Sequence, residues 1–416
     1  MTEPRKVIEF DHHSGEYAKD PVGMMRTLRE TCPVAYSEAH GGFWAVTRYD
    51  DVRRVAYETE TFSSRHDLPN GTSFTGAILP PPPTRFRPIE MDPPEATRFR
   101  RLLNPLFSRQ AIERFRPRLE EFTTRCLDER IESGAIDFVL DLTNPLPSMA
   151  TLAFLGLPVE RWEAYAMPYH NMVAYPPGSE DWVSACEGVQ RCIEEVIEAV
   201  ADRRENPRDD LLTLLVTAEL DGEPIEYDLV IETVSSLLAA GLDTTTGALT
   251  NALSYLSEHP ALRPWLLEDT ERIPTFIEEV LRYYSPTQAL ARTATRDVEL
   301  GGQLIRAGER ILNCWAGANR DGAAFSRPDE FVPDREPNKH ASFGMGVHLC
   351  LGAPFARMQM RVAVEQVLRR MPDFEVGADI KRYETIGTVN GWISMPATFT
   401  PGPRSTLDTE PEEVPA

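Results

Sequence analysis

The sequence predicts a mainly helical single domain with small β-sheets at its edges. Long segments with the period of an α-helix fill most of the 416 residues, and the β-like segments between them are short. Hydrophobic residues make up 42% of the chain, charged residues 26% and aromatic residues 9%, which are ordinary values for a folded globular protein. A chain of this length often forms two or three domains, but no linker-like segment divides this one.

Proline clusters separate the predicted helices, because proline fixes φ and removes a backbone donor. The longest helical segment, 225–259, ends before Pro260 and carries apolar residues on more than one face, so we expect it to be buried. The helices are predicted, in chain order, at 21–31, 50–58, 94–104, 108–132, 145–155, 160–172, 180–204, 209–219, 225–259, 274–284 and 353–371. Short strands are predicted near 33–36, 43–47, 290–300, 310–315 and 393–399.

Charge and composition exclude several classes of partner. The chain has 43 basic and 65 acidic side chains and a net charge of −22, whereas a nucleic acid or an anionic membrane requires a large basic surface. No apolar run approaches the ~18 residues that span a bilayer, and the first residues are polar, without a signal peptide. The six cysteines form no C-x-x-C pair and no zinc-binding spacing. We therefore expect a reduced, cytoplasmic protein that binds neither nucleic acid nor membrane.

The segment Phe343–Gly352, with the sequence FGMGVHLCLG, carries the strongest chemical signal in the chain. Two glycines one residue apart let a backbone loop pack tightly against a flat ligand. Cys350 lies just before a predicted helix, where unpaired amide groups and the helix dipole favour the thiolate form that binds metals. A lone cysteine in a glycine-rich turn is otherwise more often a buried structural residue.

This segment resembles the haem-binding loop of cytochromes P-450, F-G-x-G-x-H-x-C-x-G, and matches it at every fixed position. The resemblance covers about residues 15–402 and implies the triangular-prism fold of that family, with haem b buried between two long helices. Residues 1–14 then form an N-terminal extension, and the acidic residues 403–416 are predicted to be a disordered tail. The resemblance also implies that Cys350 is the proximal ligand of the iron. The loop residues implied to contact the cofactor are Phe343, Gly344, His348, Cys350 and Gly352.

A second motif, Glu279-x-x-Arg282, lies in the helix predicted at 274–284. Residues at i and i+3 share a helix face and can pair, but a surface ion pair contributes only ~0–1 kcal/mol and fits any helix. The position of the motif before the cysteine loop resembles the family's structural Glu-Arg-Arg network, with Arg335 as the implied third member. We expect these three residues to hold the fold and to take no part in catalysis.

The patch Ala240–Thr246 interrupts the long helix with small and polar residues. Ala240 and Gly241 allow a flat cofactor to approach closely, and the Thr244 hydroxyl can bond back to the carbonyl of residue 240. A threonine-rich kink in a core helix also explains such a patch. The patch resembles the family pattern A/G-G-x-D/E-T-T, which implies that Thr244 hydrogen-bonds the activated oxygen and that Asp243 relays protons from bulk solvent.

The two propionates of a haem are anions that need donors in a mostly apolar site. By resemblance, the donors are Arg100, Arg292 and His348. A surface charge is the simpler explanation of Arg292, and a satisfied loop histidine that of His348. Many members of the family carry a histidine where this chain has Ala96, so one expected donor is missing.

The electrons must come from outside the chain, which has no four-cysteine iron–sulfur spacing and no G-x-G-x-x-G after a strand. Residues 98–118 contain seven arginines and one glutamate, a local charge of +6, and by resemblance lie near Arg357 and Arg361 on the Cys350 side of the haem. A solvated helix explains such a run, but a basic surface there would also attract an acidic electron carrier. We expect a ferredoxin and an NAD(P)H-dependent ferredoxin reductase as partners of a monomeric enzyme.

The resemblance implies a monooxygenase that uses O2 to hydroxylate, epoxidise or O-dealkylate a hydrophobic substrate. Terpenoids, steroids, fatty-acid-like compounds and aromatic compounds all suit the apolar pocket that the resemblance places beside the haem. One alternative is a peroxygenase driven by hydrogen peroxide, although such enzymes tend to lose the acid–alcohol pair. Another is a non-catalytic haem or ligand-binding protein. The predicted pocket residues are Phe74, Ile78, Leu79, Leu237, Ala240, Thr244, Thr287, Gln288, Leu290 and Val389.

Overall fold

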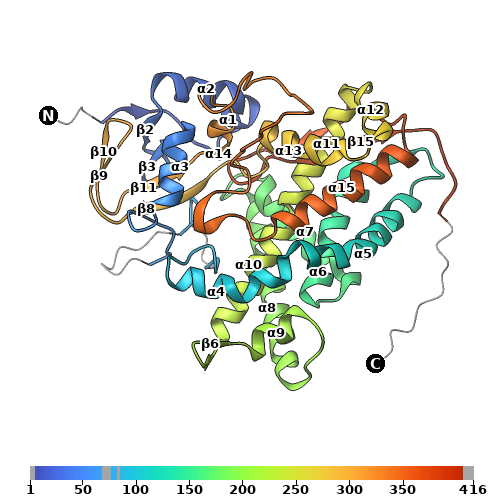
Figure 1. Ribbon diagram of the computed structural model, residues 1–416, viewed down its shortest axis with the longest axis horizontal. Helices are drawn as coiled ribbons and strands as arrows, with labels where there is room; N and C mark the ends of the chain where they lie inside the picture. The colour runs from blue at the N-terminus through green and yellow to red at the C-terminus, as the bar shows by residue number, and fades with distance from the viewer. Residues whose placement is uncertain (1–4, 68–75, 82–84, 406–416) are drawn as a thin grey trace.

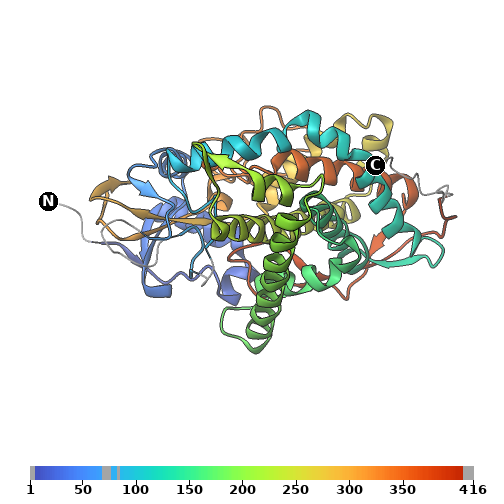
Figure 2. The same cartoon turned by 90° about the horizontal axis from the view of Figure 1, so that it is seen from below.

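The computed structural model describes residues 5–67, 76–81 and 85–405, and it confirms the mainly helical architecture predicted from the sequence. Helices fill the larger part of the molecule, and most strands gather at the end that contains the N-terminus (Figure 1). Figure 2, turned by 90°, shows the same division between a helical body and a strand-rich end. The extension at 1–14 and the tail at 403–416 stay predictions, because parts of both lie outside the described residues.

A six-stranded mixed sheet forms the strand-rich end. β11 runs parallel to the third strand of the chain and antiparallel to β8, which places Arg292 opposite Ile311. All residues of these two central strands apart from Leu290 of β8 are buried. In spatial order the sheet consists of β1 (Val7–Ile8), β2 (Val34–Ser37), β3 (Phe43–Val46), β11 (Arg310–Asn313), β8 (Leu290–Ala294) and β4 (Phe62–Ser63).

Four smaller sheets lie elsewhere in the described residues. They are formed by β9 (Val298–Leu300) with β10 (Gln303–Ile305), by β12 (Glu375–Val376), β15 (Pro396–Thr398) and β5 (Ala135–Asp137), by β13 (Lys381–Arg382) with β14 (Trp392–Ser394), and by β6 (Glu219–Leu220) with β7 (Glu223–Pro224). The single strand predicted at 290–300 is therefore two strands, β8 and β9, that belong to different sheets.

The predicted helices are all present, and apart from 225–259 their ends lie within four residues of the prediction. That segment divides at Asp243 into two helices. The short helices α1, α12 and α14 were not predicted, because one or two turns give too little periodicity. The α-helices are α1 (Gly15–Lys19), α2 (Pro21–Thr31), α3 (Tyr49–Tyr57), α4 (Glu95–Leu103), α5 (Arg109–Asp128), α6 (Pro145–Leu155), α7 (Trp162–Ala174), α8 (Glu180–Glu205), α9 (Leu211–Thr217), α10 (Tyr227–Leu242), α11 (Thr244–Glu258), α12 (Leu262–Glu268), α13 (Arg272–Tyr284), α14 (Trp315–Ala318) and α15 (Ala353–Arg370).

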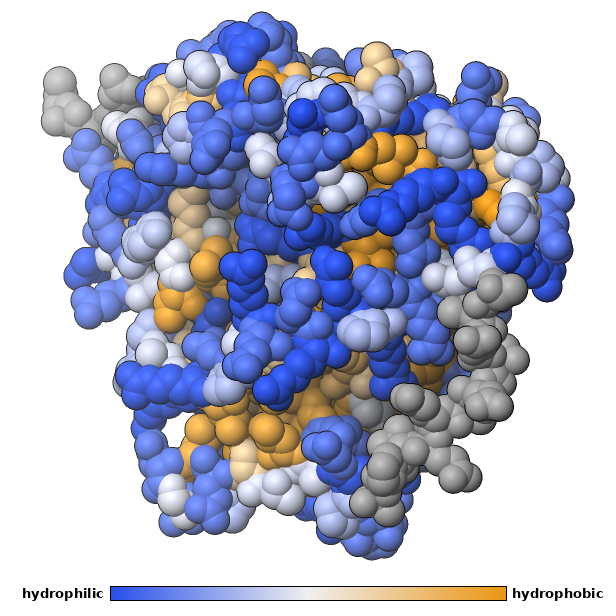
Figure 3. Space-filling view, turned by 45° about the vertical axis from the view of Figure 1, so that its right-hand side comes forward, coloured by the Kyte–Doolittle hydropathy of each residue, from blue (hydrophilic) through white to orange (hydrophobic). Residues whose placement is uncertain are grey.

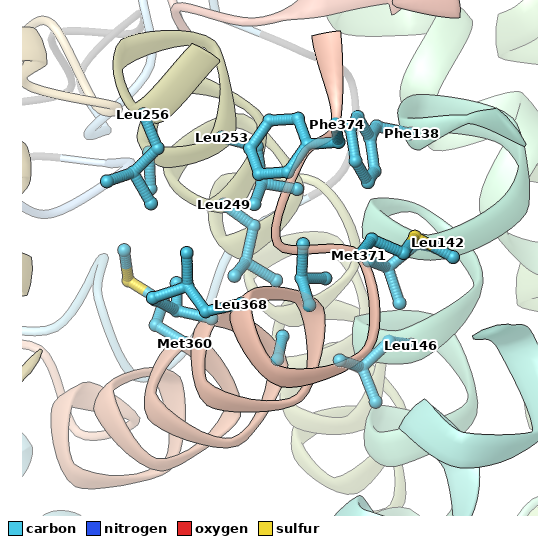
Figure 4. Close-up of a cluster of buried hydrophobic side chains, with 14 of the residues drawn as sticks. Phe138, Leu142, Leu146, Leu249, Leu253, Leu256, Met360, Leu368, Met371 and Phe374 are labelled. Carbon is cyan, nitrogen blue, oxygen red and sulfur yellow. The ribbon is translucent and has the colours of Figure 1, made fainter. Parts of the chain in front are cut away.

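The main hydrophobic core lies around α11 and α15 (Figure 4). Leu249 and Leu253 of α11 share this core with Met360 and Leu368 of α15, and all four side chains are fully buried. Burial of one such side chain contributes about 1.5–3 kcal/mol, so the core fixes the two helices firmly against each other. The chain thereby positions the patch at 240–246, where α11 begins, relative to Cys350, which precedes α15. Phe138, Leu142, Leu146, Leu256, Met371 and Phe374 complete the labelled cluster in Figure 4.

Charged and polar side chains cover most of the molecular face shown in Figure 3, and they interrupt its hydrophobic areas. Large apolar side chains that are exposed, such as Tyr57, Val183 and Ile380, are scattered along the chain, which is usual for a protein surface. Among the residues that the structure describes, no helix combines the length and the apolar character needed to cross a lipid bilayer.

Candidate active site

The Phe343–Gly352 loop presents Cys350 just before α15. The Cys350 amide donates to the Phe343 carbonyl at 2.7 Å, which closes the loop. Gly344 and Gly346 have φ values of 71° and 69°, a conformation that other residues rarely adopt. A Cβ at Gly346 would also lie 2.7 Å from the carbonyl oxygen of Ala56, so this position requires glycine.

The surroundings of the Cys350 sulfur suit a metal-binding thiolate. Burial raises the pKa of the thiol, while the amides of Gly352 and Ala353 and the guanidinium groups of Arg100 and Arg357 act in the opposite direction. Cys350 is nonetheless an exposed residue. A Cβ at Gly352 would lie 4.0 Å from the sulfur. An accessible thiol backed by amide and guanidinium groups has the chemistry of a metal ligand.

Arg292 is a buried cation on β8. Its side chain is 1% exposed, and Nη1 donates to the Ala291 carbonyl at 2.7 Å. Burial lowers the pKa of Arg292 to about 10, and the charge of Asp92 acts in the opposite direction. A buried guanidinium group without a bonded carboxylate is costly, so this cation calls for an anionic partner.

Arg100 and His348 lie near this cation. Arg100 donates from Nη2 to the Leu349 carbonyl at 2.7 Å, and Nε2 of the buried His348 has no hydrogen-bond partner among the described residues. Burial, followed by the charges of Arg292 and Arg100, lowers the pKa of His348 to about 3. Three neighbouring donors of this kind fit the two propionates of a haem. Ala96 is fully buried and offers no further donor.

The long central helix breaks at Asp243. α10 ends at Leu242, and α11 begins at Thr244, whose hydroxyl donates back to the Ala240 carbonyl at 2.7 Å. Ala240 is exposed and Thr244 is half-buried, whereas Leu242 and Asp243 are buried. One side of the break is therefore open, which a flat ligand bound beside it requires.

Gly241 faces a different neighbour from the one we predicted. The sequence led us to expect that its small size makes room for the cofactor. A Cβ at Gly241 would instead lie 2.6 Å from Oγ1 of Thr151, so the missing side chain allows α10 to pack closely on α6. Ala240 is the small residue on the open side of the break.

Two side chains that the sequence did not reveal, His170 and Tyr383, hold Asp243. Nδ1 of His170, on α7, lies 2.7 Å from Oδ1 of Asp243, and the Tyr383 hydroxyl donates to Oδ1 and Oδ2 at 2.9 and 2.8 Å. Burial and the nearby carboxylate raise the pKa of Tyr383 well above its usual value, which keeps the phenol a donor. The exposed fraction of Asp243 is 2% and that of His170 is 1%. The only signal for His170 was a lone histidine in a largely apolar helix.

Comparison with known proteins identifies this arrangement. The sequence profile of the cytochrome P-450 family matches residues 161–274 and 266–377. Cytochrome P-450 109 of Bacillus spizizenii is 33% identical over 396 residues, which cover 93% of this chain and 94% of the relative. The erythromycin C-12 hydroxylase of Saccharopolyspora erythraea is 35% identical, with 91% of this chain and 94% of the relative covered. The chain belongs to the cytochrome P-450 family.

Solved structures confirm the P-450 fold predicted by resemblance. The structure of CYP109E1 from Bacillus megaterium in complex with testosterone is similar to this one with a TM-score of 0.81 at 29% identity, and the match covers 93% of this chain and 99% of that chain. The enzyme is therefore a cytochrome P-450 monooxygenase, and its cofactor is haem b. The exposed Cys350 and the neighbouring donors Arg100, Arg292 and His348 fit this cofactor.

Glu279, Arg282 and Arg335 meet in a buried network of this P-450. Nε and Nη2 of Arg282 donate to the two carboxylate oxygens of Glu279, each at 2.8 Å, and Nε of Arg335 lies 3.1 and 3.0 Å from the same oxygens. The Val332 amide and the Asn338 side chain donate to Glu279 at 2.7 and 3.1 Å. Glu279 and Arg282 are both 0% exposed, so this pair differs from an ordinary surface ion pair.

The structure brings part of the predicted substrate pocket of the P-450 together. Thr287 and Val389 form an isolated β-bridge, and a Cβ at Gly247 of α11 would lie 3.3 Å from the Val389 side chain. Leu79 belongs to the same buried cluster as Val389. Leu237 and Leu290 pack against two other clusters, and Phe74 lies outside the described residues.

Gln288, which we expected to offer a polar group to the substrate, is engaged within the fold. Its Oε1 accepts from the Tyr17 hydroxyl at 2.9 Å, and its Nε2 donates to the Tyr284 carbonyl at 3.1 Å and to the Ser285 carbonyl. These bonds engage both polar atoms of the buried amide, so Gln288 does not offer a free polar group to a substrate.

Arg310 holds the pocket segment 76–81, a role that the sequence did not indicate. Its Nη1 donates to the Gly76 carbonyl at 3.0 Å, and its Nη2 donates to the Ile78 carbonyl at 3.1 Å. Burial lowers the pKa of Arg310 to about 10. The half-buried Ile78 is thus fixed through its backbone.

The basic segment at 98–118 carries less free charge than its composition indicates. Arg98 pairs with Asp221, and Arg116 pairs with Glu113 and Glu120. Of the arginines expected beside this segment, Arg357 pairs with Glu278 and Arg361 pairs with Glu271, each at 2.6 Å. Within segment 98–118, the exposed arginines for which the described residues provide no ion pair are Arg101, Arg109, Arg114 and Arg118.

Proposed function

We propose that this P-450 oxidises bulky hydrophobic substrates with O2 and receives its two electrons from a ferredoxin. The observation that carries the proposal is the open helix break, where Thr244 bonds to the Ala240 carbonyl next to the buried Asp243. A hydroxyl and a carboxylate at this place suit the delivery of protons, which O2 activation needs and a reaction driven by hydrogen peroxide does not.

Residues of several segments of the chain would hold the haem. When bound, the haem supplies the redox chemistry by which O2 gives one oxygen atom to the substrate and the other to water, with two electrons and two protons consumed. Cys350 would bind the iron, and Arg100, Arg292 and His348 would donate to the propionates. Ala240 would leave room on the opposite side.

Proton delivery would run through three side chains. The Thr244 hydroxyl is the donor on the open side of the break. Asp243 stands next to it in the chain, but His170 and Tyr383 separate its carboxylate from bulk solvent. Because Nε2 of His170 has no partner among the described residues, the imidazole can take up a proton at Nε2 and pass one to Asp243 from Nδ1.

Electrons would arrive at the surface formed by the exposed arginines of α4 and α5. α5 packs on α15, the helix after Cys350, and Arg100 of α4 bonds to the loop itself. A positive surface on a chain of net charge −22 attracts an acidic carrier to one place. We therefore expect Arg101→Glu and Arg114→Glu to raise the KM for ferredoxin at low salt. Arg382→Glu, at an exposed site on β13, is the control and should leave it unchanged.

The substrate would be of steroid or macrolide size. The relatives support this class, since one is named an erythromycin C-12 hydroxylase and the solved CYP109E1 holds testosterone. Leu79 and Val389 supply apolar surface from one buried cluster, and Leu237 comes from α10. A shift of the Soret band on adding members of a steroid, terpenoid and macrolide library tests the class, and the absence of any shift would contradict it.

One experiment separates the proposal from the alternatives. The purified holoenzyme is supplied with a bound library compound and either NADPH, ferredoxin reductase and ferredoxin, or hydrogen peroxide alone. We expect oxidised product with the electron-transfer proteins and little with peroxide. Product with peroxide only would indicate a peroxygenase, and no product with either would indicate a haem protein that binds without turnover.

A further inference from the structure

A second cluster of metal-binding side chains lies in the strand-rich end, outside the haem site. Asp11 and His12 lie between β1 and α1, and His40 lies in the turn Ala39–Gly41 between β2 and β3. One ligand atom from each of the three residues lies within 4.8 Å of the others. Nε2 of His40 is 2.7 Å from Oδ1 of Asp11, and Nδ1 of His12 is 3.9 Å from the same oxygen.

The hydrogen bonds of His12 fix which of its nitrogens can bind a metal. Nε2 of His12 lies 2.8 Å from the Leu79 carbonyl, and since a carbonyl only accepts, Nε2 carries the proton. Nδ1 therefore has a free lone pair. It has no hydrogen-bond partner among the described residues, although the side chain is only 2% exposed. A metal-binding histidine usually donates its other N–H to a carbonyl or carboxylate in this way.

We propose that Asp11, His12 and His40 form a binding site for one divalent transition-metal ion, with Zn²⁺ as the best-fitting ion. Two imidazole nitrogens and one carboxylate oxygen are the donor set of many zinc sites that keep a fourth position for water. Atoms that bind one zinc at ~2.0–2.1 Å in tetrahedral geometry lie roughly 3.3 Å apart. The observed 2.7 and 3.9 Å bracket this separation, so small side-chain rotations complete the site. Without an ion, Nε2 of His40 donates its proton to Asp11, so binding requires the His40 tautomer that carries the proton on Nδ1.

The charges in the cluster favour a cation. Asp11 brings a carboxylate, and its Oδ1 faces both imidazole groups. Asp11 and His40 are partly exposed, which gives an ion a path from solvent.

The neighbouring His13 does not share this role. Its Nδ1 lies 3.1 Å from the Thr385 hydroxyl, and its Nε2 lies 3.0 Å from the Leu79 carbonyl, so both ring nitrogens are engaged. An ion at the three-residue site would join the N-terminal segment to the β2–β3 turn. Through His12 it would also fix the carbonyl of Leu79, a residue of the predicted substrate pocket.

Zinc binding to the haem-loaded full chain tests the proposal. Protein treated with EDTA and then desalted is titrated with Zn²⁺ by calorimetry, and bound zinc is counted by mass spectrometry after dialysis. We expect one Zn²⁺ per chain in the parent protein. Asp11→Asn and His40→Asn should each raise the Kd at least tenfold, as loss of a ligand requires.

Two histidine variants serve as controls. His13→Asn lies in the same cluster and His259→Asn is an exposed site on the surface, and neither should change the Kd for Zn²⁺. The reduced carbon-monoxide spectrum shows whether each variant keeps its haem site. A parent protein that retains no zinc, or variants at Asp11 and His40 that bind it as tightly as the parent, would show that the cluster is held by hydrogen bonds alone and overturn the proposal.

Discussion

Two buried clusters of ionisable side chains, one around Glu279 and one around Asp243, differ in how completely their polar atoms are paired. Glu279 receives hydrogen bonds from two guanidinium groups, a backbone amide and an asparagine. Arg282 directs its remaining N–H groups to the carbonyls of residues 319, 328 and 330. Among the described residues, the Asp243 carboxylate is bonded only to an imidazole and a phenol, and Nε2 of that imidazole has no partner there.

This difference is what we expect between a cluster that holds the fold and one that moves a proton. In the Glu279 network, any change of charge leaves several buried groups unpaired, so the network resists it. In the Asp243 cluster, Nε2 of the imidazole has no hydrogen-bond partner among the described residues and is free to bind a proton. The cluster also lies beside Thr244, where the helix is broken. Burial alone therefore does not distinguish the Glu279 network from the Asp243 cluster. The number of donors and acceptors that lack a hydrogen-bond partner does.

The largest effect is expected for Glu279→Ala. Without the carboxylate, Arg282 and Arg335 are buried with no counter-charge, which costs roughly 3–5 kcal/mol. We expect little haem-loaded protein, measured by the yield of the reduced carbon-monoxide band and by thermal unfolding. Glu268→Ala removes the exposed partner of Arg272 and should change stability by ~0–1 kcal/mol. A stable, haem-loaded Glu279→Ala variant would show that this network contributes no more to stability than the surface pair does.

Thr244→Ala tests the Asp243 cluster at the hydroxyl that would deliver the proton. Electron uptake should continue, because Cys350 and the basic surface are unchanged, but the hydroxyl that bonds to Ala240 is lost. We expect product per NADPH to fall on the order of 10²-fold, the low end for a lost proton-transfer group, with hydrogen peroxide formed in its place. Thr244→Ser keeps a hydroxyl and should keep most of the product. Full coupling in Thr244→Ala would assign proton delivery to Thr245 or to ordered water.

Motifs that lie within one segment of the chain made much of the fold and of the candidate site predictable from the sequence. The loop around Cys350 and the pair Glu279 and Arg282 are each set by spacing within one segment, and the back-bond of Thr244 follows from its position one turn after Ala240. The helices were predictable because their apolar residues repeat with a fixed period.

The features of the candidate site that the sequence did not predict depend on contacts between distant segments. His170 and Tyr383 lie 73 and 140 residues from Asp243 in the chain, and only the packing of α7 against α10 brings the histidine to the break. The neighbour of Gly241 depends on which helix packs there, and this is Thr151 of α6. In the same way, composition gave the charge of segment 98–118 but not the acidic partners that neutralise part of it.

His170→Asn distinguishes holding Asp243 from passing it a proton. Asparagine places an N–H close to the position of Nδ1, so the bond to Asp243 can persist, but an amide does not titrate near neutral pH. We expect product formation to fall about tenfold and the solvent deuterium isotope effect to rise, since a slower proton-transfer step limits turnover. His259→Asn, at an exposed histidine, is the matched control. If His170→Asn kept the turnover and the isotope effect of the parent, the imidazole would only position Asp243 and would not pass it a proton.

Tyr383→Phe should have the smallest effect on turnover. The phenol keeps its proton because its pKa is raised well above the usual value, so we expect it to stabilise Asp243 as a hydrogen-bond donor. Its loss removes a hydrogen bond to a charged group, about 1.5–3 kcal/mol of stability, while His170 still holds the carboxylate. Tyr17→Phe is the matched control, because Tyr17 is equally buried but donates to the neutral amide of Gln288, so it should cost only about 0.5–1.5 kcal/mol. Thermal unfolding of the two variants measures this difference, and steady-state rates should stay close to those of the parent. If Tyr383→Phe slowed product formation more than His170→Asn does, the proton would enter through the phenol, and the unpaired nitrogen of His170 would not mark its path.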